Sequence, residues 1–288
     1  MFPCTLLTLL FLAADPTEAR QGGNLQSSRD QRLTFAKQAA AGYQFRLPDA
    51  ASHKVIVQPE PLLRWDNHVV REDDGMLFLW TDGEKGRPIA GAQFFLVDTV
   101  WHHEFQSLAA EPIAARDQRG NWNWGPTREG VRWQVAEELS APGDSATQRL
   151  RQMKQFVGQF TAAVDQNAGF DAPEQLRLLT TPLYRYSSSD AEIIDGAMFG
   201  FVQGTNPEIL VMIEATNRSP TKAAWRYGFA RMSCFYLQVY RDGKIIWSQQ
   251  RAPVPTPDRA SPYYFRLSAQ TDASAEVVVR PQPGSARP

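Results

Sequence analysis

The residues best suited to chemistry lie in one short run, Trp101-His102-His103-Glu104-Phe105. On a β-strand successive side chains point to opposite faces, so His102 and Glu104 would share a face and His103 would point to the other. An imidazole and a carboxylate on one face suit two metal ligands, or a general base with the acid that orients it. The alternative is an ordinary cross-strand or solvent-facing pair with no chemical role.

A metal site needs a third ligand, and His68 is the obvious candidate. The HxxEH and HExxH patterns of metalloproteases are absent from the sequence. G-x-S-x-G, Walker A, G-x-G-x-x-G and Cys-x-x-Cys are absent too. We therefore expect no cofactor, and zinc is the metal that the alternative would use.

Two arginines precede aromatic residues at equivalent places, Arg64 before Trp65 and Arg185 before Tyr186. Such a side chain can bind an anionic ligand or pair with a carboxylate of its own region, here Asp74 or Asp195. Because both partners recur together, the sequence favours the internal pair.

A cluster of indoles offers a second binding candidate in the loop after this region. Aromatic faces beside amides suit the ring of a sugar, whereas packing in the core or in a loop is the competing interpretation. The residues concerned are Trp122, Trp124 and Trp133, beside Asn121, Asn123 and Arg132.

Two capping boxes predict the helices that precede these residues. Ser28 with Gln31 and Ser145 with Gln148 both fit the S-x-x-Q pattern, in which serine and glutamine satisfy free N–H groups of the first turn. Apolar residues at helical spacing follow each cap. They are Leu33, Ala36, Ala40 and Tyr43 after the first, and Leu150, Met153, Val157, Phe160 and Val164 after the second.

The remaining pattern predicts antiparallel strands joined by tight turns. Asp-Gly pairs that favour positive φ separate short apolar runs, at Asp74-Gly75, Asp82-Gly83, Asp195-Gly196 and Asp242-Gly243. Residues 76–80 and 209–213 are apolar on both alternating faces, so those strands must be covered on one side by a helix and on the other by a second sheet.

The chain also resembles itself. Pro61-Leu62-Leu63-Arg64-Trp65 aligns with Pro182-Leu183-Tyr184-Arg185-Tyr186, and residues 74–80 then align with 195–201 without a gap. We therefore predict an α+β fold of two tandem repeats, each a helix followed by an antiparallel β-meander, over residues 27–143 and 144–268. Two unrelated α+β domains with chance matches are the alternative.

The N-terminus predicts export. An apolar run from Leu6 to Leu12 precedes Ala13-Ala14, as in a signal peptide, here residues 1–19, and is too short to span a membrane. No Lys or Arg precedes the run, and a buried N-terminal helix is the alternative. Removal of Cys4 would leave Cys234 alone, as a buried unreactive thiol. The Ser-, Pro- and Arg-rich residues 269–288 are expected to be disordered.

Composition excludes some partners. The 288 residues carry 30 Lys and Arg against 31 Asp and Glu, a net charge of −1, which argues against a generally basic nucleic-acid binder. With 43% hydrophobic and 21% charged residues, most of the chain should bury a core. No later segment is apolar enough for a membrane span, so the partners expected are a small ligand or an envelope component.

Four segments resemble a group of exported, uncharacterised planctomycete-type bacterial proteins. They are residues 61–65, 74–80, His103-Glu104-Phe105-Gln106-Ser107-Leu108, and Leu176-Arg177-Leu178-Leu179 continuing to Arg185-Tyr186. The resemblance covers most of residues 30–250. It implies export, and it implies neither an activity nor site residues.

These observations predict an exported, non-catalytic protein, periplasmic, cell-surface or secreted, that binds a ligand or is associated with the envelope. The binding site would lie in the cleft between the two units or on an open sheet. The alternative is a metal-assisted hydrolase that uses His102, Glu104 and His68. A third interpretation is a purely structural envelope component.

Overall fold

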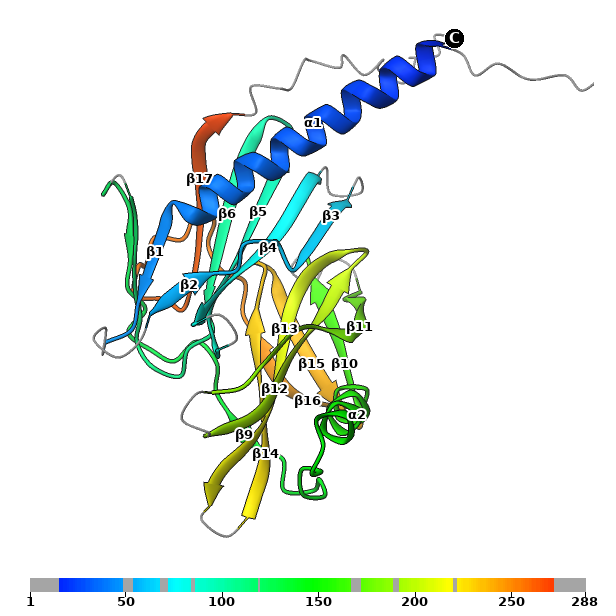
Figure 1. The fold of residues 1–288 in the computed structure, drawn as a ribbon, viewed down its shortest axis with the longest axis vertical. Coiled ribbons are helices and arrows are strands. Elements are labelled where there is room, and N and C mark those ends of the chain that lie inside the picture. The colour runs from blue at the N-terminus through cyan, green and yellow to red at the C-terminus, as the bar shows by residue number, and fades with distance from the viewer. Residues whose placement is uncertain are drawn as a thin grey trace, which may run out of the picture.

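The computed structural model describes residues 16–48, 54–67, 72–83, 86–118, 120–166, 172–188, 192–219 and 222–271. Within these ranges the chain is mostly antiparallel β-sheet with two helices, α1 (Pro16–Ala41) and α2 (Ala146–Val157) (Figure 1). Every strand pairing is antiparallel, as the turn-rich sequence predicted. No helix in this described part is long and apolar enough to cross a membrane.

The first large sheet has six strands and lies beside α1. Its order is β17-β6-β5-β4-β2, and β3 pairs with β4 beside that path. The strands are β2 (Val55–Val57), β3 (Leu63–Asn67), β4 (Glu72–Asp82), β5 (Pro88–Val97), β6 (Val100–Ser107) and β17 (Tyr263–Thr271). A smaller sheet joins β1 (Tyr43–Arg46), β7 (Ala114–Asp117) and β8 (Asn123–Trp124).

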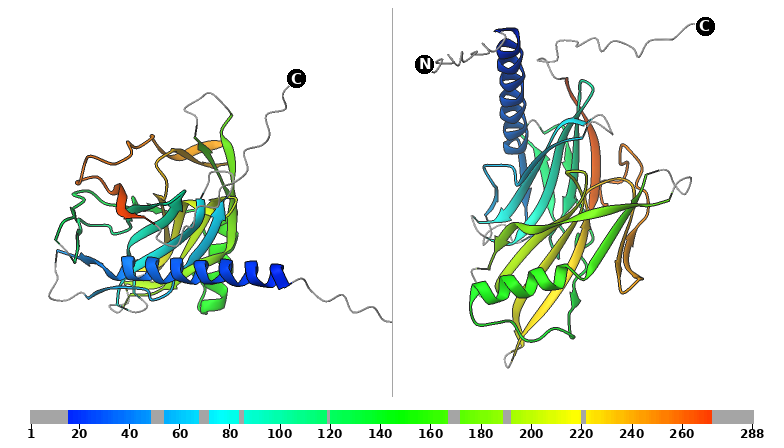
Figure 2. Two further views of the ribbon diagram at one scale, coloured as in Figure 1. Left: turned by 90° about the horizontal axis from the view of Figure 1, so that it is seen from above. Right: turned by 90° about the vertical axis from the view of Figure 1, so that its right-hand side faces the viewer.

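The second large sheet has eight strands and carries α2. Its order is β16-β15-β10-β11-β12-β13-β14-β9. The strands are β9 (Gln134–Val135), β10 (Phe160–Asp165), β11 (Glu174–Tyr186), β12 (Ile193–Gln203), β13 (Asn206–Ser219), β14 (Lys222–Arg231), β15 (Tyr236–Arg241) and β16 (Lys244–Gln249). Figure 2 shows the two large sheets with their helices at opposite ends of the molecule.

Three hydrophobic cores hold these layers together. In β4, Met76 and Phe78 point into a first core that includes Ala36 and Ala40 of α1, while Leu77 and Leu79 point into an interface core shared by the two large sheets. Strand β12 alternates in the same way, between a second core, which includes α2, and the interface core. Residues 209–213 of β13 do the same, with Ile209 and Val211 in the second core and Leu210 and Met212 in the interface core. The burial predicted for residues 76–80 and 209–213 on both faces is thus confirmed.

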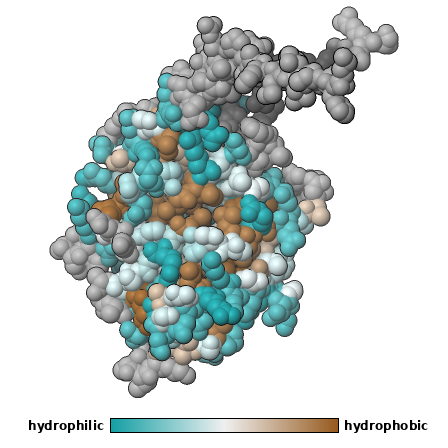
Figure 3. Space-filling model, turned by 45° about the vertical axis from the view of Figure 1, so that its right-hand side comes forward, coloured by the Kyte–Doolittle hydropathy of each residue, from teal (hydrophilic) through white to brown (hydrophobic). Residues whose placement is uncertain are grey.

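The interface core joins the two large sheets and includes three methionines, Met198, Met212 and Met232. Half-buried apolar residues from both sheets border it, among them Leu63 and Leu183. Figure 3 shows apolar side chains gathered across the middle of one face, with hydrophilic residues around them.

Only one of the two predicted helix starts is correct. At α2, Ser145 is the N-cap, its hydroxyl accepts from the Gln148 N–H at 3.2 Å, and the Gln148 amide oxygen accepts from the Ser145 N–H at 3.1 Å. Helix α1 instead begins at Pro16, so Ser28 lies inside it. The predicted stripe also outruns α2, because the chain leaves the helix at Gly158 and places Phe160 and Val164 on β10.

Two of the four predicted Asp-Gly turns are strand interiors instead. Asp242 and Gly243 have φ values of 51° and 73° and form a turn, and Gly83 has a φ of 76°. Gly75 and Gly196 lie within β4 and β12.

At both strand glycines an aromatic ring takes the space of the missing side chain. A Cβ on Gly75 would lie 2.2 Å from the Trp65 ring, and one on Gly196 would lie 2.5 Å from the Tyr186 ring. Glycine is required at these two positions because the neighbouring strand lays its ring across the backbone.

The last strand of each predicted unit pairs with the sheet of the other unit. Strand β17 pairs with β6, and β9 pairs with β14. The prediction of a disordered segment from residue 269 is therefore wrong for residues 269–271, which belong to β17. Residues 272–288 and 1–15 lie outside the described residues.

Candidate functional site

The His102-His103-Glu104 run lies on β6 with the alternation predicted for a strand. His103 points into the first core, where its Nδ1 is 2.7 Å from the Tyr43 hydroxyl oxygen. His102 points to the other face, where its ring lies 5.5 Å from the ring of Phe265. Glu104 is buried among interface-core residues.

The Glu104 carboxylate is held by a hydrogen bond from the Tyr263 hydroxyl of β17. Within the described ranges no group of three His, Cys, Asp or Glu side chains could hold a metal ion, and His68 lies outside those ranges. His102 and Glu104 thus share a face, but none of the described residues joins them there as a third ligand.

His103 makes stability depend on pH. Its side chain is 4% exposed, and burial, helped by Arg266 and His102, lowers its pKa from 6.5 to about 3. Burial also raises the pKa of Tyr43 to about 12, so the Tyr43 hydroxyl stays neutral and shares its hydrogen bond with an uncharged imidazole.

We therefore expect the free energy of unfolding to fall as the pH drops from 6.5 toward 3, because the unfolded chain binds a proton that the folded chain excludes. The slope from this group alone is up to about 1.4 kcal/mol per pH unit. Urea unfolding of the wild type and of His103→Gln between pH 7 and pH 4.5 measures it. Equal pH slopes for the two proteins would contradict the assignment.

Arg64 is not free to bind a ligand. Its Nε and Nη2 donate to the two oxygens of Asp74 at 2.8 Å and 2.5 Å. Arg185 donates to Asp195 at 2.5 Å. The predicted internal pairs are confirmed, and the two residues that looked like anion ligands serve to fasten β3 to β4 and β11 to β12.

The predicted sugar-binding indoles are also structural. Trp122 and Trp124 are 4% and 1% exposed in the first core. The Nε1 of Trp124 donates to the Ser261 carbonyl at 2.8 Å, so the segment before β17 covers it. Packing in the core, the competing interpretation, is correct because both rings point toward the first sheet and away from solvent.

Trp133 lies between two guanidinium groups. The Arg226 guanidinium is 4.6 Å from the centre of its ring and that of Arg87 is 5.5 Å away. Glu214, fully buried on β13, accepts from Arg226 Nε at 2.5 Å and lies 3.4 Å from Arg87 Nε. Trp133 therefore belongs to a buried ionic cluster that ties the start of β5 to the second large sheet.

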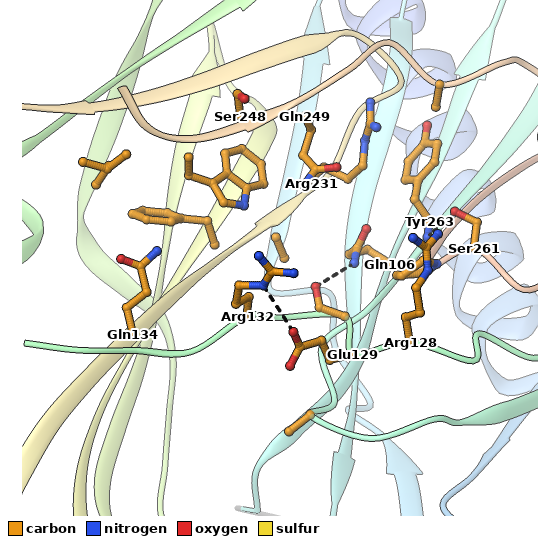
Figure 4. Close-up of a pocket in the computed structure, with 18 residues that line it drawn as sticks. Gln106, Arg128, Glu129, Arg132, Gln134, Arg231, Ser248, Gln249, Ser261 and Tyr263 are labelled. Atoms are coloured by element: carbon orange, nitrogen blue, oxygen red, sulfur yellow. Dashed lines mark hydrogen bonds and ion pairs between the residues drawn. The ribbon is translucent and has the colours of Figure 1, made fainter. Parts of the chain in front are cut away.

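A pocket of about 840 Å³ opens where the two large sheets meet (Figure 4). Its walls are the end of β6, the loop before β9, the end of β14, strand β16 and the segment before β17. The lining residues are Gln106, Ala110, Arg128, Glu129, Gly130, Arg132, Gln134, Phe229, Ala230, Arg231, Ile246, Trp247, Ser248, Gln249, Ala252, Ser261, Pro262 and Tyr263.

Gln106 holds the loop wall of the pocket in place. It is 3% exposed, and its amide nitrogen donates to the carbonyls of Ser107 and Gly130 at 2.8 Å and 3.2 Å. Two carbonyl acceptors fix which end of the amide is nitrogen. This places residues 128–132 beside the C-terminal end of β6, where Arg132 and Glu129 form an exposed pair with a 3.4 Å separation.

Arg231 brings a fixed positive charge to the wall. It is 7% exposed, and its three nitrogens donate to the carbonyls of Ser233, Phe235 and Gln250 at 2.8–2.9 Å. Its guanidinium lies 4.5 Å from the ring centre of Tyr263. Arginine keeps its charge in proteins, so these neutral acceptors leave the cation in place.

The potentially reactive groups behind this wall are held in their neutral forms. Cys234 is half-buried instead of fully buried, and desolvation still raises the pKa of its thiol to about 12, so the predicted lack of reactivity holds. Burial and the neighbouring Glu104 raise the pKa of Tyr263 well above its usual value. Neither side chain is a nucleophile at neutral pH.

Sequence reasoning missed the residues that line this pocket. Gln106 and Arg231 stand in strands without a recognisable motif, and Arg128 is one arginine in a loop. Trp247 of β16 opposes Val239 of β15, and Trp124 of β8 opposes Ala115 of β7.

Comparison of the chain with protein-family models, with curated protein sequences and with solved structures found no match in any of the three.

Proposed function

We propose that this chain is an exported, non-catalytic binding protein that holds a small polar ligand in the pocket between its two large sheets. The pocket itself carries the proposal. Its volume of about 840 Å³ falls in the 300–1,000 Å³ range of small-molecule sites, and sites of this kind occur preferentially where structural units meet.

Binding without catalysis is supported by the state of the nearby ionisable groups. The Cys234 thiol is unreactive at neutral pH, and the Glu104 carboxylate is already engaged by Tyr263. General acid–base or nucleophilic chemistry needs a group within reach of the substrate and with a pKa near the working pH. Glu104, Cys234 and the His102–His103 pair do not line the pocket.

A duplication of one unit is part of the proposal, and strand register supports it. Three pairs in the first sheet recur in the second at one constant spacing along the chain. Val57–Trp80, Arg64–Met76 and Trp65–Gly75 have the counterparts Leu178–Phe201, Arg185–Ala197 and Tyr186–Gly196. Recurrence of the same ring over the same glycine is hard to explain by chance matches between unrelated domains.

Export rests on the order of residues at the N-terminus, an apolar run followed by small residues. Placement of the binding pocket outside the cytoplasm would bring it into contact with envelope or environmental molecules. Mass spectrometry of the N-terminus of the protein purified from its native cells tests this part, and a retained Met1 with a cytoplasmic location would contradict it.

The binding function is tested by thermal unfolding of the full chain with a panel of neutral sugars, acidic sugars, amino acids, dipeptides and nucleotides at millimolar concentration. At least one compound should raise the Tm of the wild type, because a ligand at 100 times its Kd adds about 2.7 kcal/mol to stability. The matched control is Gln249→Trp, which fills the pocket from exposed β16. Shifts of equal size in both proteins, or none in either, would contradict the proposal.

A further inference from the structure

The hydrogen-bonding groups left open in this pocket are mainly donors. Within the described part of the chain, neither the Arg128 guanidinium nor the Trp247 indole N–H has a hydrogen-bond partner. Gln134 accepts from the Tyr227 hydroxyl at 2.9 Å through its oxygen, which leaves its amide N–H groups to donate. A ligand that satisfies these groups must present acceptor oxygens.

The charges of the lining also favour a ligand that carries acceptor oxygens, and in particular a negatively charged one. The lining contains three arginines, Arg128, Arg132 and Arg231, and one carboxylate, Glu129. Outside the lining, Glu104 and Glu208 lie near enough to Arg231 to act on it electrostatically, so the open positive charge is mainly that of Arg128. Glu129 is already paired with Arg132, and Arg231 is bound to carbonyls alone. A cleft lined by an excess of one charge attracts the opposite charge, and a guanidinium matches a carboxylate with two parallel hydrogen bonds.

An aromatic face completes the set. Trp247 is half-buried on β16, and its ring lies 5.7 Å from that of Phe229. Trp124 has its indole N–H bonded to the Ser261 carbonyl, whereas the Trp247 indole at the pocket has no such bond among the described residues. An indole face with amides and donors around it suits a ring that carries hydroxyl groups.

We propose that the ligand is a carboxylate-bearing carbohydrate, a sugar acid or a short chain of them, with a ring on Trp247 and its carboxylate on Arg128. This inference rests on the proposed function, since it names the ligand class of the same pocket. A hydroxyl oxygen of the sugar would accept a hydrogen bond from the Trp247 indole N–H, as the Ser261 carbonyl does from the Trp124 indole N–H.

Calorimetric titration of the full chain with three probes tests the class. The probes are trigalacturonate, a neutral galactose trisaccharide of the same length, and free glutamate. We expect trigalacturonate to bind at least tenfold more tightly than the neutral trisaccharide, because only it offers a carboxylate to Arg128. We expect the same margin over glutamate, because glutamate has no ring to place on Trp247.

Two variants assign the contacts. Arg128→Gln should remove the preference for trigalacturonate over the neutral trisaccharide, and Trp247→Ala should weaken both trisaccharides about tenfold. Arg46→Gln, an exposed arginine on β1 outside the pocket lining, is the control that should change nothing.

The outcomes separate the two proposals. Equal affinity for acidic and neutral trisaccharides would overturn the carboxylate assignment, and binding of glutamate as tight as trigalacturonate would overturn the sugar. Absence of all binding would overturn the inference as a whole. In the first two cases the proposed function survives if the bound probe stabilises the wild type and not Gln249→Trp. If no probe binds, the proposed function survives only if another compound of the panel does so, and it falls with the inference if none does.

Discussion

Replacement of Gly75 by alanine is expected to lower the free energy of unfolding by about 3 kcal/mol, and Gly196→Ala should act in the same way. The new Cβ would lie 2.2 Å from the Trp65 ring in the first case and 2.5 Å from the Tyr186 ring in the second. Both rings are almost fully buried, so they can move only if the cores around them repack. Overpacking of this kind costs about 1–3 kcal/mol and sometimes more.

Gly91→Ala is the matched control for these variants. It lies on buried β5, and its Cβ would meet Met232, Leu108 and Leu210 at ordinary contact distances of 3.6–3.7 Å. We expect it to change stability by less than about 1 kcal/mol. Urea unfolding measures all three variants. In a Trp65→Leu background, Gly75→Ala should cost much less, and an unchanged cost there would show that the ring is not the cause.

Glu214→Ala is expected to cost about 3–5 kcal/mol, the largest effect of any single side-chain truncation in the ionic cluster. Glu214 is fully buried and accepts from Arg226 Nε at 2.5 Å and from the Tyr186 hydroxyl at 2.9 Å. Its removal leaves Arg87 without this carboxylate and leaves Arg226, 4% exposed, with the longer 4.0 Å ion pair to Glu192. Breaking a buried ion pair from one side has this cost.

An exposed pair supplies the comparison. Glu138 pairs with Arg241 at 43% exposure of its side chain, so Glu138→Ala should cost less than about 1 kcal/mol. The double variant Glu214→Leu with Arg226→Met should recover at least half of the loss from Glu214→Ala, since an apolar pair can replace a buried ionic one. A loss below 1 kcal/mol for Glu214→Ala would contradict the role assigned to the cluster.

The features predicted correctly from sequence are those that nearby residues determine. The Ser145 cap, the alternation of His102 and His103 on a strand and the Arg64–Asp74 pair each depend on residues within about ten positions of one another. The Asp74-Gly75 turn was wrong for an equally local reason. An Asp-Gly dipeptide favours a turn, but its glycine can also lie within a strand, where the missing side chain leaves room for an aromatic ring of the neighbouring strand.

The candidate site was largely hidden because its parts come together through long-range pairing. The pocket joins Gln106 and Arg128 to Arg231 and Trp247, which lie more than 100 positions further along the chain. No periodicity or motif connects them. Trp124 is buried partly because the segment before β17 covers it, with the Ser261 carbonyl accepting from its indole N–H. The residues near Trp124 in the sequence do not predict this contact.

Strand β17 has a consequence for the order in which the chain can acquire its structure. It covers the open edge of β6, and Tyr263 meets Glu104 across a separation of 159 residues. A chain made from its N-terminus must therefore complete nearly all of the second sheet before the first sheet gains its last neighbour. Until then β6 presents an unpaired edge, the kind of surface to which other unfinished chains add. A nascent chain with this topology benefits from being shielded, by a chaperone or by continued unfolding, until its last strand has been synthesised.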